Sequence, residues 1–264
     1  MSRPRHLLRA WPRLRSRLRR AKRRALFTDY DGTLTRIRRR PELAALDERM
    51  RRALQEASVA SEIAGVVSGR RLKDVMARVG IAGIWYVGVH GFFLRNPGGK
   101  DFSLARPATC KTMSRLSRRL QRELRGLAGI EVEPKRATVA VHYRRASRGA
   151  RKRAHAIVKS NLAPDLDILQ GKKVWEFISS PSPRRRAVNK WTAIEFILRR
   201  AGFRRSDHPA VAYLGDDVTD EHVFRKLRGI TVAVGKRRRT AARYYLRSPA
   251  EVREFLAAWK ESRQ

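Results

Sequence analysis

Leu26-Phe27-Thr28-Asp29-Tyr30-Asp31-Gly32-Thr33-Leu34-Thr35 joins an apolar run to two closely spaced carboxylates and a glycine. Side chains at positions i and i+2 of a β-strand point to the same face, so Asp29 and Asp31 are expected to converge where a strand ends. Gly32 then allows the chain to turn. Because neighbouring carboxylates repel each other, this arrangement predicts either a shared proton or a bound metal ion.

A second acidic segment has the same relation to an apolar run. Ala210-Val211-Ala212-Tyr213-Leu214 is followed directly by Gly215-Asp216-Asp217-Val218-Thr219-Asp220-Glu221. The carboxyl ends of parallel strands lie at one edge of a sheet, so we expect the two acidic segments to meet there. So many carboxylates around one point favour a metal site over a shared proton.

The chain is strongly basic: 264 residues contain 62 Lys and Arg against 24 Asp and Glu, a formal net charge of +38. Such a balance ordinarily indicates nucleic acid or an anionic membrane as a partner. Here the cations are spread along the chain in pairs and triplets such as Arg38-Arg39-Arg40, Arg184-Arg185-Arg186 and Arg237-Arg238-Arg239. We therefore favour a solvated basic surface over nucleic-acid binding.

The single cysteine, Cys110, excludes an intrachain disulfide and favours a reducing compartment. No apolar run approaches the roughly 20 residues that span a bilayer, and the first 24 residues lack the apolar centre of a secretory signal. The sequence therefore predicts a cytoplasmic protein without a transmembrane segment. It gives no indication of an oligomeric state.

Residues 1–24 are predicted to form a basic N-terminal extension. Their apolar side chains recur at helical spacing among arginines, at Leu7, Leu8, Trp11, Leu14 and Leu18. A basic amphipathic helix of this kind is suited to anionic lipid. Pro4 and Pro12 argue against a continuous helix, so we favour a poorly ordered or loosely docked extension.

From residue 25 onward, apolar strands alternate with amphipathic helices. Strands are expected before Asp29 and at 64–68, 85–89, 210–214 and 230–234, and helices at 42–61, 71–79, 188–201, 222–227 and 250–259. This alternation predicts an α/β fold with a doubly wound, Rossmann-like parallel-sheet core, whose site lies at the carboxyl ends of the strands.

From about residue 92 the pattern changes. Helices at 109–127 and 148–162, with short strands at 130–134, 137–143, 166–170 and 173–178, predict an inserted α+β domain. A turn at Asn96-Pro97-Gly98-Gly99 leads into this insertion, and Ser180-Pro181-Ser182-Pro183 is expected to lead back. We assign residues 25–91 and 184–264 to the core and residues 92–183 to the insertion.

Four sequence features fall at predicted strand ends or at a helix start: Asp29 with Asp31, Ser68 before Gly69, Lys190, and Asp216 with Asp220. Transfer of a phosphoryl group needs an in-line nucleophile, a proton donor for the leaving oxygen, and positive charge on the other phosphate oxygens. Carboxylates form aspartyl-phosphate intermediates, and Mg²⁺ prefers oxygen ligands. Together the four features predict Mg²⁺-dependent phosphoryl transfer.

These four motifs, in this order, resemble those of the haloacid dehalogenase superfamily of phosphohydrolases. The resemblance covers nearly all of residues 24–264 and implies that Asp29 is the nucleophile and Asp31 the acid/base. It implies that Ser68, Thr33 and Lys190 hold the phosphoryl group. It also implies that Mg²⁺ is bound by Asp29, the backbone carbonyl of Asp31 and Asp216, with Asp220 among the ligands or directly beyond them. Asp217 is the less certain acidic residue, and whether Asp217 or Asp220 completes the metal site is left open.

An insertion between Ser68 and Lys190 is similar to the larger α/β cap of superfamily members that act on small metabolites. Within that group, the chain most resembles the phosphatases of trehalose 6-phosphate, through Val67-Ser68-Gly69-Arg70, Glu133-Pro134-Lys135, Val141-His142-Tyr143-Arg144, Gly171-Lys172-Lys173-Val174-Trp175-Glu176 and the segment from Gly215 to Glu221. The resemblance implies that the cap binds the sugar through Glu133, Lys135, Arg144, Lys172 and Glu176.

Two positions depart from that pattern. Phe93 stands where an acidic or polar residue is common, and Trp191 follows Lys190 in a segment that lacks the usual glycine. A phosphatase for another sugar phosphate, of the sucrose or mannosylglycerate type, therefore remains an alternative. A polyanion-binding protein on a retained phosphatase fold is a further alternative, which the acidic residues oppose because they would repel phosphates in the absence of a metal.

Overall fold

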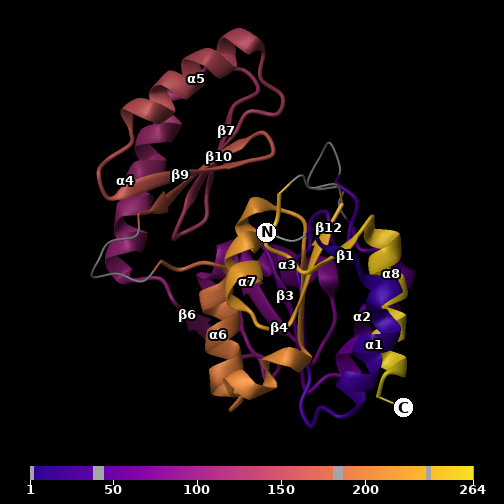
Figure 1. Ribbon diagram of the computed structural model, residues 1–264. Coiled ribbons are helices and arrows are strands. Elements are labelled where there is room, and N and C mark those ends of the chain that lie inside the picture. Colours follow the sequence, from indigo (N-terminus) through magenta and orange to yellow (C-terminus); the bar gives the residue numbers. More distant parts are fainter. Residues whose placement is uncertain (1–2, 38–44, 181–186, 236–238, 264) are drawn as a thin grey trace. The chain divides into compact units, whose positions relative to one another are not determined.

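The computed structural model describes residues 1–264 except 1–2, 38–44, 181–186, 236–238 and 264. The chain divides into two compact units (Figure 1). The core unit comprises Met1–Phe102 and Val188–Gln264, and the inserted unit comprises Ser103–Ala187. Each unit has its own sheet and its own apolar core.

A largely parallel sheet forms the centre of the core unit. In the described part of the chain its nine strands run in the order β1-β13-β12-β11-β2-β3-β4-β5-β6. Neighbours from β1 to β4 are parallel, and β5 runs antiparallel to β4. The strands are β1 (Arg5–His6), β2 (Ala25–Thr28), β3 (Ile63–Val67), β4 (Trp85–Gly88), β5 (Phe93–Arg95), β6 (Asp101–Ser103), β11 (Val211–Gly215), β12 (Ile230–Val234) and β13 (Tyr244–Leu246).

Helices cover both faces of this sheet (Figure 1). One face shares an apolar cluster with α1, α2, α3 and α8. On the other face, Phe224 of α7 packs against Tyr213 of β11, and Phe196 of α6 packs against Phe102 of β6. The helices are α1 (Leu7–Arg19), α2 (Glu48–Val59), α3 (Leu72–Val79), α6 (Lys190–Arg200), α7 (Glu221–Lys226) and α8 (Pro249–Glu261). This is the doubly wound α/β core that the sequence predicts.

The strand order reverses next to β2. From β2 the chain continues through β3 and β4 on one side, whereas β11, β12 and β13 follow one another on the other side. Crevices at such a switch point, at the carboxyl ends of the strands, are where ligands bind in open α/β sheets. Asp29 follows β2 and Asp216 follows β11, so both acidic segments lie at this point of the sheet.

The N-terminal residues are part of the core unit, which corrects the prediction of a poorly ordered or loosely docked extension. β1 pairs in parallel with β13. Trp11 of α1 contacts Phe255 and Trp259 of α8, with ring centroids 5.1 and 6.4 Å apart. The helix runs through Pro12 because burial of its apolar side compensates for the hydrogen bond that proline cannot donate.

The inserted unit is a four-stranded antiparallel sheet in the order β7-β8-β10-β9, packed against two helices. The strands are β7 (Glu131–Pro134), β8 (Val139–His142), β9 (Leu166–Gly171) and β10 (Val174–Ser179). The helices are α4 (Pro107–Glu123) and α5 (Arg148–Ser160), whose apolar side chains share one cluster with Val139, Val141 and Phe177 of the sheet. It is the α+β unit that the sequence predicts.

Residues 92–102, which were assigned to the insertion, extend the core sheet as β5 and β6. β5 pairs with β4, and Arg95 forms an ion pair with Asp101 across the Asn96-Pro97-Gly98-Gly99 turn. The predicted return to the core at residue 184 lies outside the described residues, as do the first residues of the helix predicted at 42–61. That helix begins at Glu48, where the Asp47 side chain accepts a hydrogen bond from the Met50 N–H.

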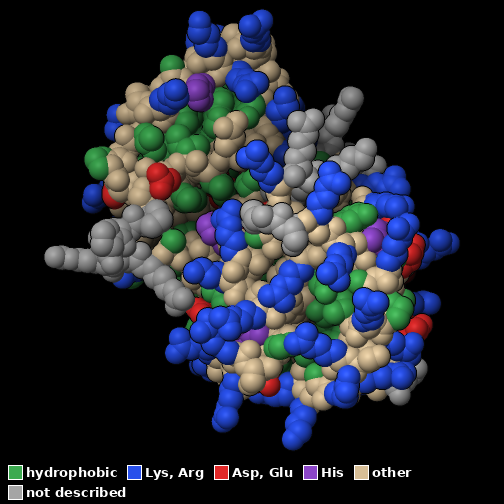
Figure 2. Space-filling view, viewed as in Figure 1, with side chains coloured by type: hydrophobic (Ala, Val, Ile, Leu, Met, Phe, Trp, Pro, Cys, Tyr) green, Lys and Arg blue, Asp and Glu red, His purple; other side chains and the backbone are tan. Residues whose placement is uncertain are grey.

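Lys and Arg side chains are distributed over much of the face that Figure 2 shows. This distribution agrees with the spread of cations along the sequence. In the described part of the chain, no helix has both the length and the apolar character that crossing a membrane requires.

Candidate active site

Asp29, Lys190 and Asp220 form a buried ion-pair cluster at the carboxyl ends of β2 and β11. Lys190 Nζ lies 2.7 Å from Oδ1 of Asp29 and 2.7 Å from Oδ1 of Asp220. Lys190 is the first residue of α6, and the Asn189 side chain caps this helix by accepting a hydrogen bond from Thr192 N–H. The helix start is thereby fixed, and with it the lysine.

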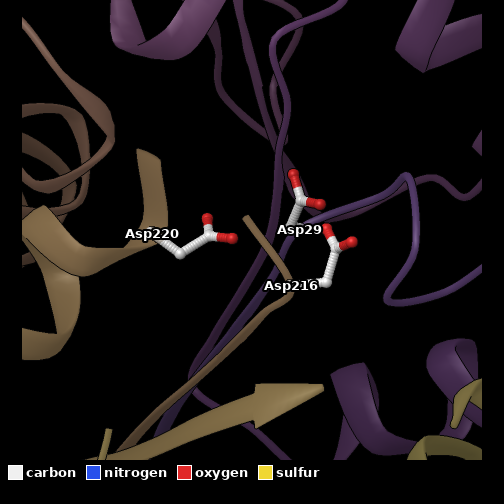
Figure 3. Close-up of side chains that lie close together, drawn as sticks. All are labelled: Asp29, Asp216 and Asp220. Carbon is white, nitrogen blue, oxygen red and sulfur yellow. The ribbon is translucent and has the colours of Figure 1, made fainter. Parts of the chain in front are cut away.

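Asp216 completes an acidic cluster with Asp29 and Asp220. Each of the three offers one carboxylate oxygen, and these oxygens all lie within 4.8 Å of one another. Figure 3 shows the carboxyl groups of Asp29, from the segment after β2, and of Asp216 and Asp220, from the segment after β11, turned toward a common region. This is the meeting of the two acidic segments that the sequence predicts. The structure places Asp220, rather than Asp217, in the cluster.

Two glycines make room for these carboxylates. A Cβ atom at Gly32 would lie 2.1 Å from Oδ2 of Asp216, and one at Gly215 would lie 2.3 Å from Cγ of Asp220. Gly32 also has φ = +84°, a left-handed conformation that favours glycine. Gly32 of the first acidic segment thus leaves space for Asp216 of the second, and Gly215 leaves space for Asp220 of its own segment.

The cluster brings together three acidic side chains and one lysine. Burial raises the pKa of Asp29 well above its usual range, Lys190 opposes this rise, and Asp220 and Asp216 add to it. Burial alone would lower the pKa of Lys190, but the carboxylates of Asp220 and Asp29 outweigh burial and raise it. Lys190 is therefore a charged ammonium between two acids.

The acidic cluster also fits a divalent cation, because hard cations prefer carboxylate oxygens and would offset their negative charge. Hydrogen bonds from Tyr213 OH (2.6 Å) and Asp217 N–H (2.7 Å) hold the Asp220 carboxylate in place. Tyr213 was not identified from the sequence as part of the site, and the close approach of Gly32 and Gly215 to the carboxylates was not predicted. Tyr213 could have been suspected, because it lies two residues before Gly215 in a buried strand.

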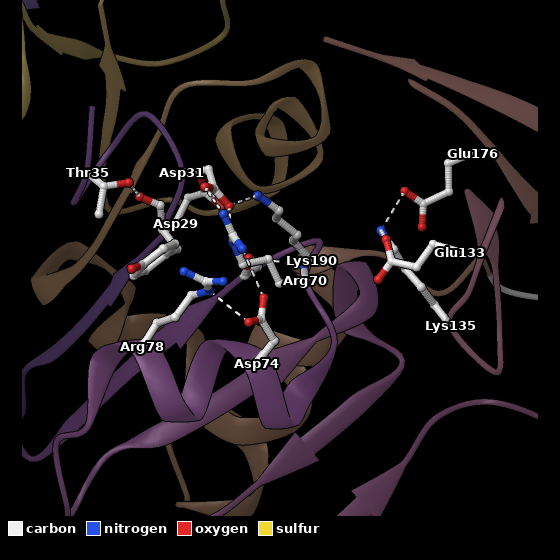
Figure 4. A network of polar contacts seen from close by, with 12 residues as sticks. Asp29, Asp31, Thr35, Arg70, Asp74, Arg78, Glu133, Lys135, Glu176 and Lys190 are labelled. Atoms are coloured by element: carbon white, nitrogen blue, oxygen red, sulfur yellow. Dashed lines mark hydrogen bonds and ion pairs between the residues drawn. The ribbon is translucent and has the colours of Figure 1, made fainter. Parts of the chain in front are cut away.

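Asp31 lies apart from the acidic cluster in its side-chain contacts. Arg70 donates hydrogen bonds from Nε to Oδ2 of Asp31 (2.6 Å) and from Nη2 to Oδ1 (2.7 Å) (Figure 4). The expected convergence of the Asp29 and Asp31 side chains is not seen in these contacts, because β2 ends at Thr28 and the strand alternation does not extend to Asp31. Arg70 was not identified from the sequence as a site residue.

Ser68 and Thr33 supply hydroxyl groups close to these segments. Ser68 follows β3, and its Oγ accepts a hydrogen bond from Arg70 N–H at 3.2 Å. Thr33 follows Gly32, and its Oγ1 is buried without a hydrogen-bond partner among the described residues. A buried hydroxyl in this condition favours a polar ligand, because desolvation without a hydrogen bond is costly.

The loop at Val89 and His90, which follows β4, lies between the Ser68 segment and the start of α6. Both residues have positive φ angles, of 50° and 55°. A Cβ atom at Gly69 would lie 2.4 Å from the His90 ring, and one at Gly91 would lie 2.4 Å from the Asn189 carbonyl oxygen. The loop therefore packs against Gly69, next to Ser68, and against Asn189, next to Lys190. The positive φ angles of Val89 and His90 are a form of backbone strain that clusters at functional sites.

In the inserted unit, Glu133, Ala140 and Glu176 are register partners across β7, β8 and β10. Their neighbours Val139, Val141 and Phe177 face the helices, so this row lies on the opposite face. Lys135 Nζ contacts Glu176 Oε2 at 3.3 Å and Glu133 Oε2 at 3.8 Å.

The two glutamates of this row have further partners. Thr138 donates to Glu176 Oε1 at 2.6 Å, and His142 Nε2 lies 3.0 Å from Glu133 Oε2. Glu133, Lys135 and Glu176 are thereby brought together. Arg144 and Lys172 meet at the turn between β9 and β10, where Arg144 donates to the Lys172 carbonyl at 2.9 Å. Thr138 was not identified from the sequence.

The core and its site define a class of protein. A carboxylate after the central strand, a lysine at a helix start and two further carboxylates after the neighbouring strand, on a doubly wound core with an insertion, are typical of haloacid dehalogenase-like hydrolases. A solved structure of such a hydrolase from Bacteroides thetaiotaomicron has the same fold, with a TM-score of 0.62, 14% identity, and coverage of 89% of this chain and 98% of that one.

Within this class the chain belongs to the trehalose-phosphatase family, whose sequence profile matches residues 27–250. A trehalose-phosphate phosphatase of Mycobacterium ulcerans is 36% identical over 239 residues, which cover 88% of this chain and 60% of that protein. The C-terminal domain of the trehalose-6-phosphate phosphatase of C. albicans shares the fold with a TM-score of 0.75, at 23% identity, over 98% of this chain and 99% of that one. The chain thus spans about 60% of the length of this curated relative.

Proposed function

We propose that this protein is a Mg²⁺-dependent phosphatase that hydrolyses trehalose 6-phosphate to trehalose and inorganic phosphate. The observation that carries the proposal is the buried Asp29 carboxylate, 2.7 Å from Lys190 Nζ and within an acidic cluster, in a chain of the trehalose-phosphatase family. The reaction uses Asp29 as nucleophile. A carboxylate oxygen of Asp29 forms a bond to phosphorus while the bond from phosphorus to the sugar oxygen breaks.

Asp31 is the acid and base of the two half-reactions. In the first it gives a proton to the leaving sugar oxygen, and in the second it takes a proton from the water that attacks phosphorus of the aspartyl-phosphate. That second step releases phosphate and restores the Asp29 carboxylate. The position of Asp31 two residues after Asp29, in the loop that closes at Thr35, supports this role.

Lys190, Ser68 and Thr33 hold the oxygens of the phosphoryl group. Lys190 brings a positive charge into a buried site, where charge on the transferring group is stabilised most effectively. The buried Thr33 hydroxyl without a partner among the described residues supports a ligand at that point. The Lys190 ammonium group that contacts Asp29 would also contact the phosphate, so it would orient the nucleophile and the phosphate together.

Mg²⁺ would be held by the carboxylates of Asp29, Asp216 and Asp220 and by the backbone carbonyl of Asp31. When bound, it would offset the repulsion among these acids and between Asp29 and the incoming phosphate dianion. The oxygen-only donor set supports the choice of Mg²⁺ over softer metals.

The sugar would be bound through Glu133, Lys135, Arg144, Lys172 and Glu176 of the inserted unit. Sugar hydroxyls both donate and accept hydrogen bonds, and charged partners make the stronger ones. The face of β7, β8 and β10 that carries Glu133 and Glu176 supports this proposal, because it offers carboxylate oxygens and an ammonium group side by side. We further propose a cytoplasmic location, which the use of a single cysteine, with no intrachain disulfide possible, supports.

A phosphate-release screen tests the proposal. Trehalose 6-phosphate, sucrose 6-phosphate, mannosylglycerate phosphate and glucose 6-phosphate are each incubated with the protein, with Mg²⁺ and with EDTA. We expect release from trehalose 6-phosphate with Mg²⁺ and none with EDTA. Preferential release from another ester would reject the substrate and retain the chemistry, and no release from any ester would reject both.

A further inference from the structure

Arg70 links two segments of the site. Its main-chain N–H donates to Ser68 Oγ at 3.2 Å, and its guanidinium group donates to both carboxylate oxygens of Asp31, at 2.6 and 2.7 Å. The guanidinium carbon lies 5.4 Å from the centre of the buried Tyr30 ring. A bidentate contact of this kind fixes both the distance between the guanidinium and the carboxylate and the orientation of the carboxylate plane.

Helix α3 holds Arg70 in turn. Arg70 Nη1 donates to Oδ2 of Asp74 at 2.9 Å, and Arg78 Nε donates to Oδ1 of the same carboxylate at 2.7 Å. Asp74 and Arg78 lie one turn apart on α3, and Arg70 lies just before the start of that helix. Figure 4 shows the resulting row from Arg78 through Asp74 and Arg70 to Asp31.

The Asp31 side chain depends on this row for its orientation. It is 42% exposed, whereas the Arg70 side chain is 12% exposed. An acid in a loop beyond the end of a strand has several rotamers available, and an ion pair to a largely buried guanidinium selects one of them.

We propose that Arg70, held by Asp74 and Arg78, is a positioning residue that orients the Asp31 carboxyl toward the leaving oxygen of the substrate. This inference rests on the proposed function. Both Asp31 oxygens accept hydrogen bonds from Arg70, and proton transfer needs one of them. While one Asp31 oxygen carries the proton toward the leaving oxygen, the hydrogen bond from Arg70 to the other oxygen keeps the carboxyl group in place.

The test compares two leaving groups. Formation of the aspartyl-phosphate from trehalose 6-phosphate expels a poor leaving group that needs a proton, whereas p-nitrophenyl phosphate expels a stable anion that does not. The ratio kcat/KM reports the steps up to the first irreversible one, here bond cleavage. A group that acts through the acid therefore affects kcat/KM for the sugar ester alone.

Arg70→Ala is expected to lower kcat/KM for trehalose 6-phosphate by about 10²-fold and for p-nitrophenyl phosphate by less than about 3-fold. Arg70→Lys retains one hydrogen bond, so kcat/KM for trehalose 6-phosphate is expected to fall less than in Arg70→Ala. Asp74→Asn is expected to lower kcat/KM for trehalose 6-phosphate by a smaller factor, again with little effect on p-nitrophenyl phosphate. Arg95→Ala removes an exposed ion pair with Asp101 in the same unit and serves as the matched control.

A double-mutant cycle separates positioning from a direct effect. If Arg70 acts through Asp31, Arg70→Ala causes no further loss in kcat/KM for the sugar ester when Asp31→Asn is already present. Equal losses for both esters, or additive losses in the cycle, would overturn the inference and leave the proposed function standing. Absence of phosphate release by the unmodified protein from both esters would overturn the proposed function and this inference with it.

Discussion

The two polar clusters of this protein are built in different ways. In the core unit, Asp29, Asp216, Asp220 and Lys190 come from loops after parallel strands and from a helix start. In the inserted unit, Glu133 and Glu176 come from alternate positions of antiparallel strands in register. The first cluster therefore depends on short sequence motifs, and the second depends on strand pairing.

Their charges are also compensated differently. Lys190 is the cation that contacts Asp29 and Asp220, both of which are buried. Asp220 also accepts hydrogen bonds from Tyr213 OH and Asp217 N–H, whereas the Asp29 carboxylate accepts its hydrogen bond from Lys190. In the inserted unit, Glu133 and Glu176 both keep contacts with other residues, His142 and Thr138, in addition to Lys135. We therefore expect the loss of the lysine to lower the free energy of unfolding more in the core cluster than in the inserted cluster.

The largest effect is expected from Asp29→Asn. The amide keeps the shape of the side chain but is not a nucleophile, so phosphate release should fall by at least about 10³-fold. Thermal unfolding should show a folded protein, because the substitution removes one of several crowded carboxylates. A variant that kept its rate would show that another group attacks phosphorus.

Lys190→Met and Lys135→Met compare the two clusters directly. Lys190→Met leaves the buried Asp29 carboxylate without its ammonium partner, while Asp220 keeps its hydrogen bonds from Tyr213 and Asp217 N–H, so the free energy of unfolding should fall by about 3–5 kcal/mol in the presence of EDTA. Lys135→Met should lower it by about 1–2 kcal/mol, because each glutamate retains another hydrogen-bond partner. Denaturant unfolding measures both, and equal losses would contradict the contrast drawn between the clusters.

Gly32→Ala is expected to lower phosphate release by about 10²-fold, because the added methyl group displaces the Asp216 carboxylate. Gly99→Ala is the matched control. Gly99 has φ = +81°, close to the +84° of Gly32, but a Cβ atom there would meet nothing within 4 Å. Both variants should lose stability from the left-handed backbone, and a comparable loss of activity in Gly99→Ala would refute the role of the close approach.

The smallest effect is expected from Glu176→Gln in the inserted unit. It weakens a charged hydrogen bond to the sugar, which is worth about 1.5–3 kcal/mol, so KM for trehalose 6-phosphate should rise about 10-fold or more with kcat nearly unchanged. Steady-state kinetics check this split. A fall in kcat with constant KM would instead assign Glu176 to the chemical step.

The contrast between the clusters also explains what the sequence could predict. The acidic segments follow apolar strands directly, so their meeting at the carboxyl ends of β2 and β11 was predictable from local pattern alone. The pairing of Asp31 with Arg70 was not, because it joins residues 39 positions apart through side-chain rotamers that no local pattern specifies. The Glu133 and Glu176 row was identified by resemblance, since strand register cannot be read from short alternating segments.

The N-terminal helix was misjudged for a related reason. Its apolar spacing was visible, but Pro12 was given more weight than the packing of Trp11 against α8, which only the tertiary structure reveals. β5 and β6 were missed because strands of three residues are too short to distinguish from a loop.

The most direct test of the account is to trap the phosphoryl group on the protein. The enzyme is mixed with trehalose 6-phosphate and Mg²⁺, quenched in acid and reduced with borohydride, which converts an aspartyl-phosphate to homoserine, and the peptides are analysed by mass spectrometry. The account predicts homoserine at position 29. Phosphate release without modification there, or with modification at another carboxylate, would contradict it.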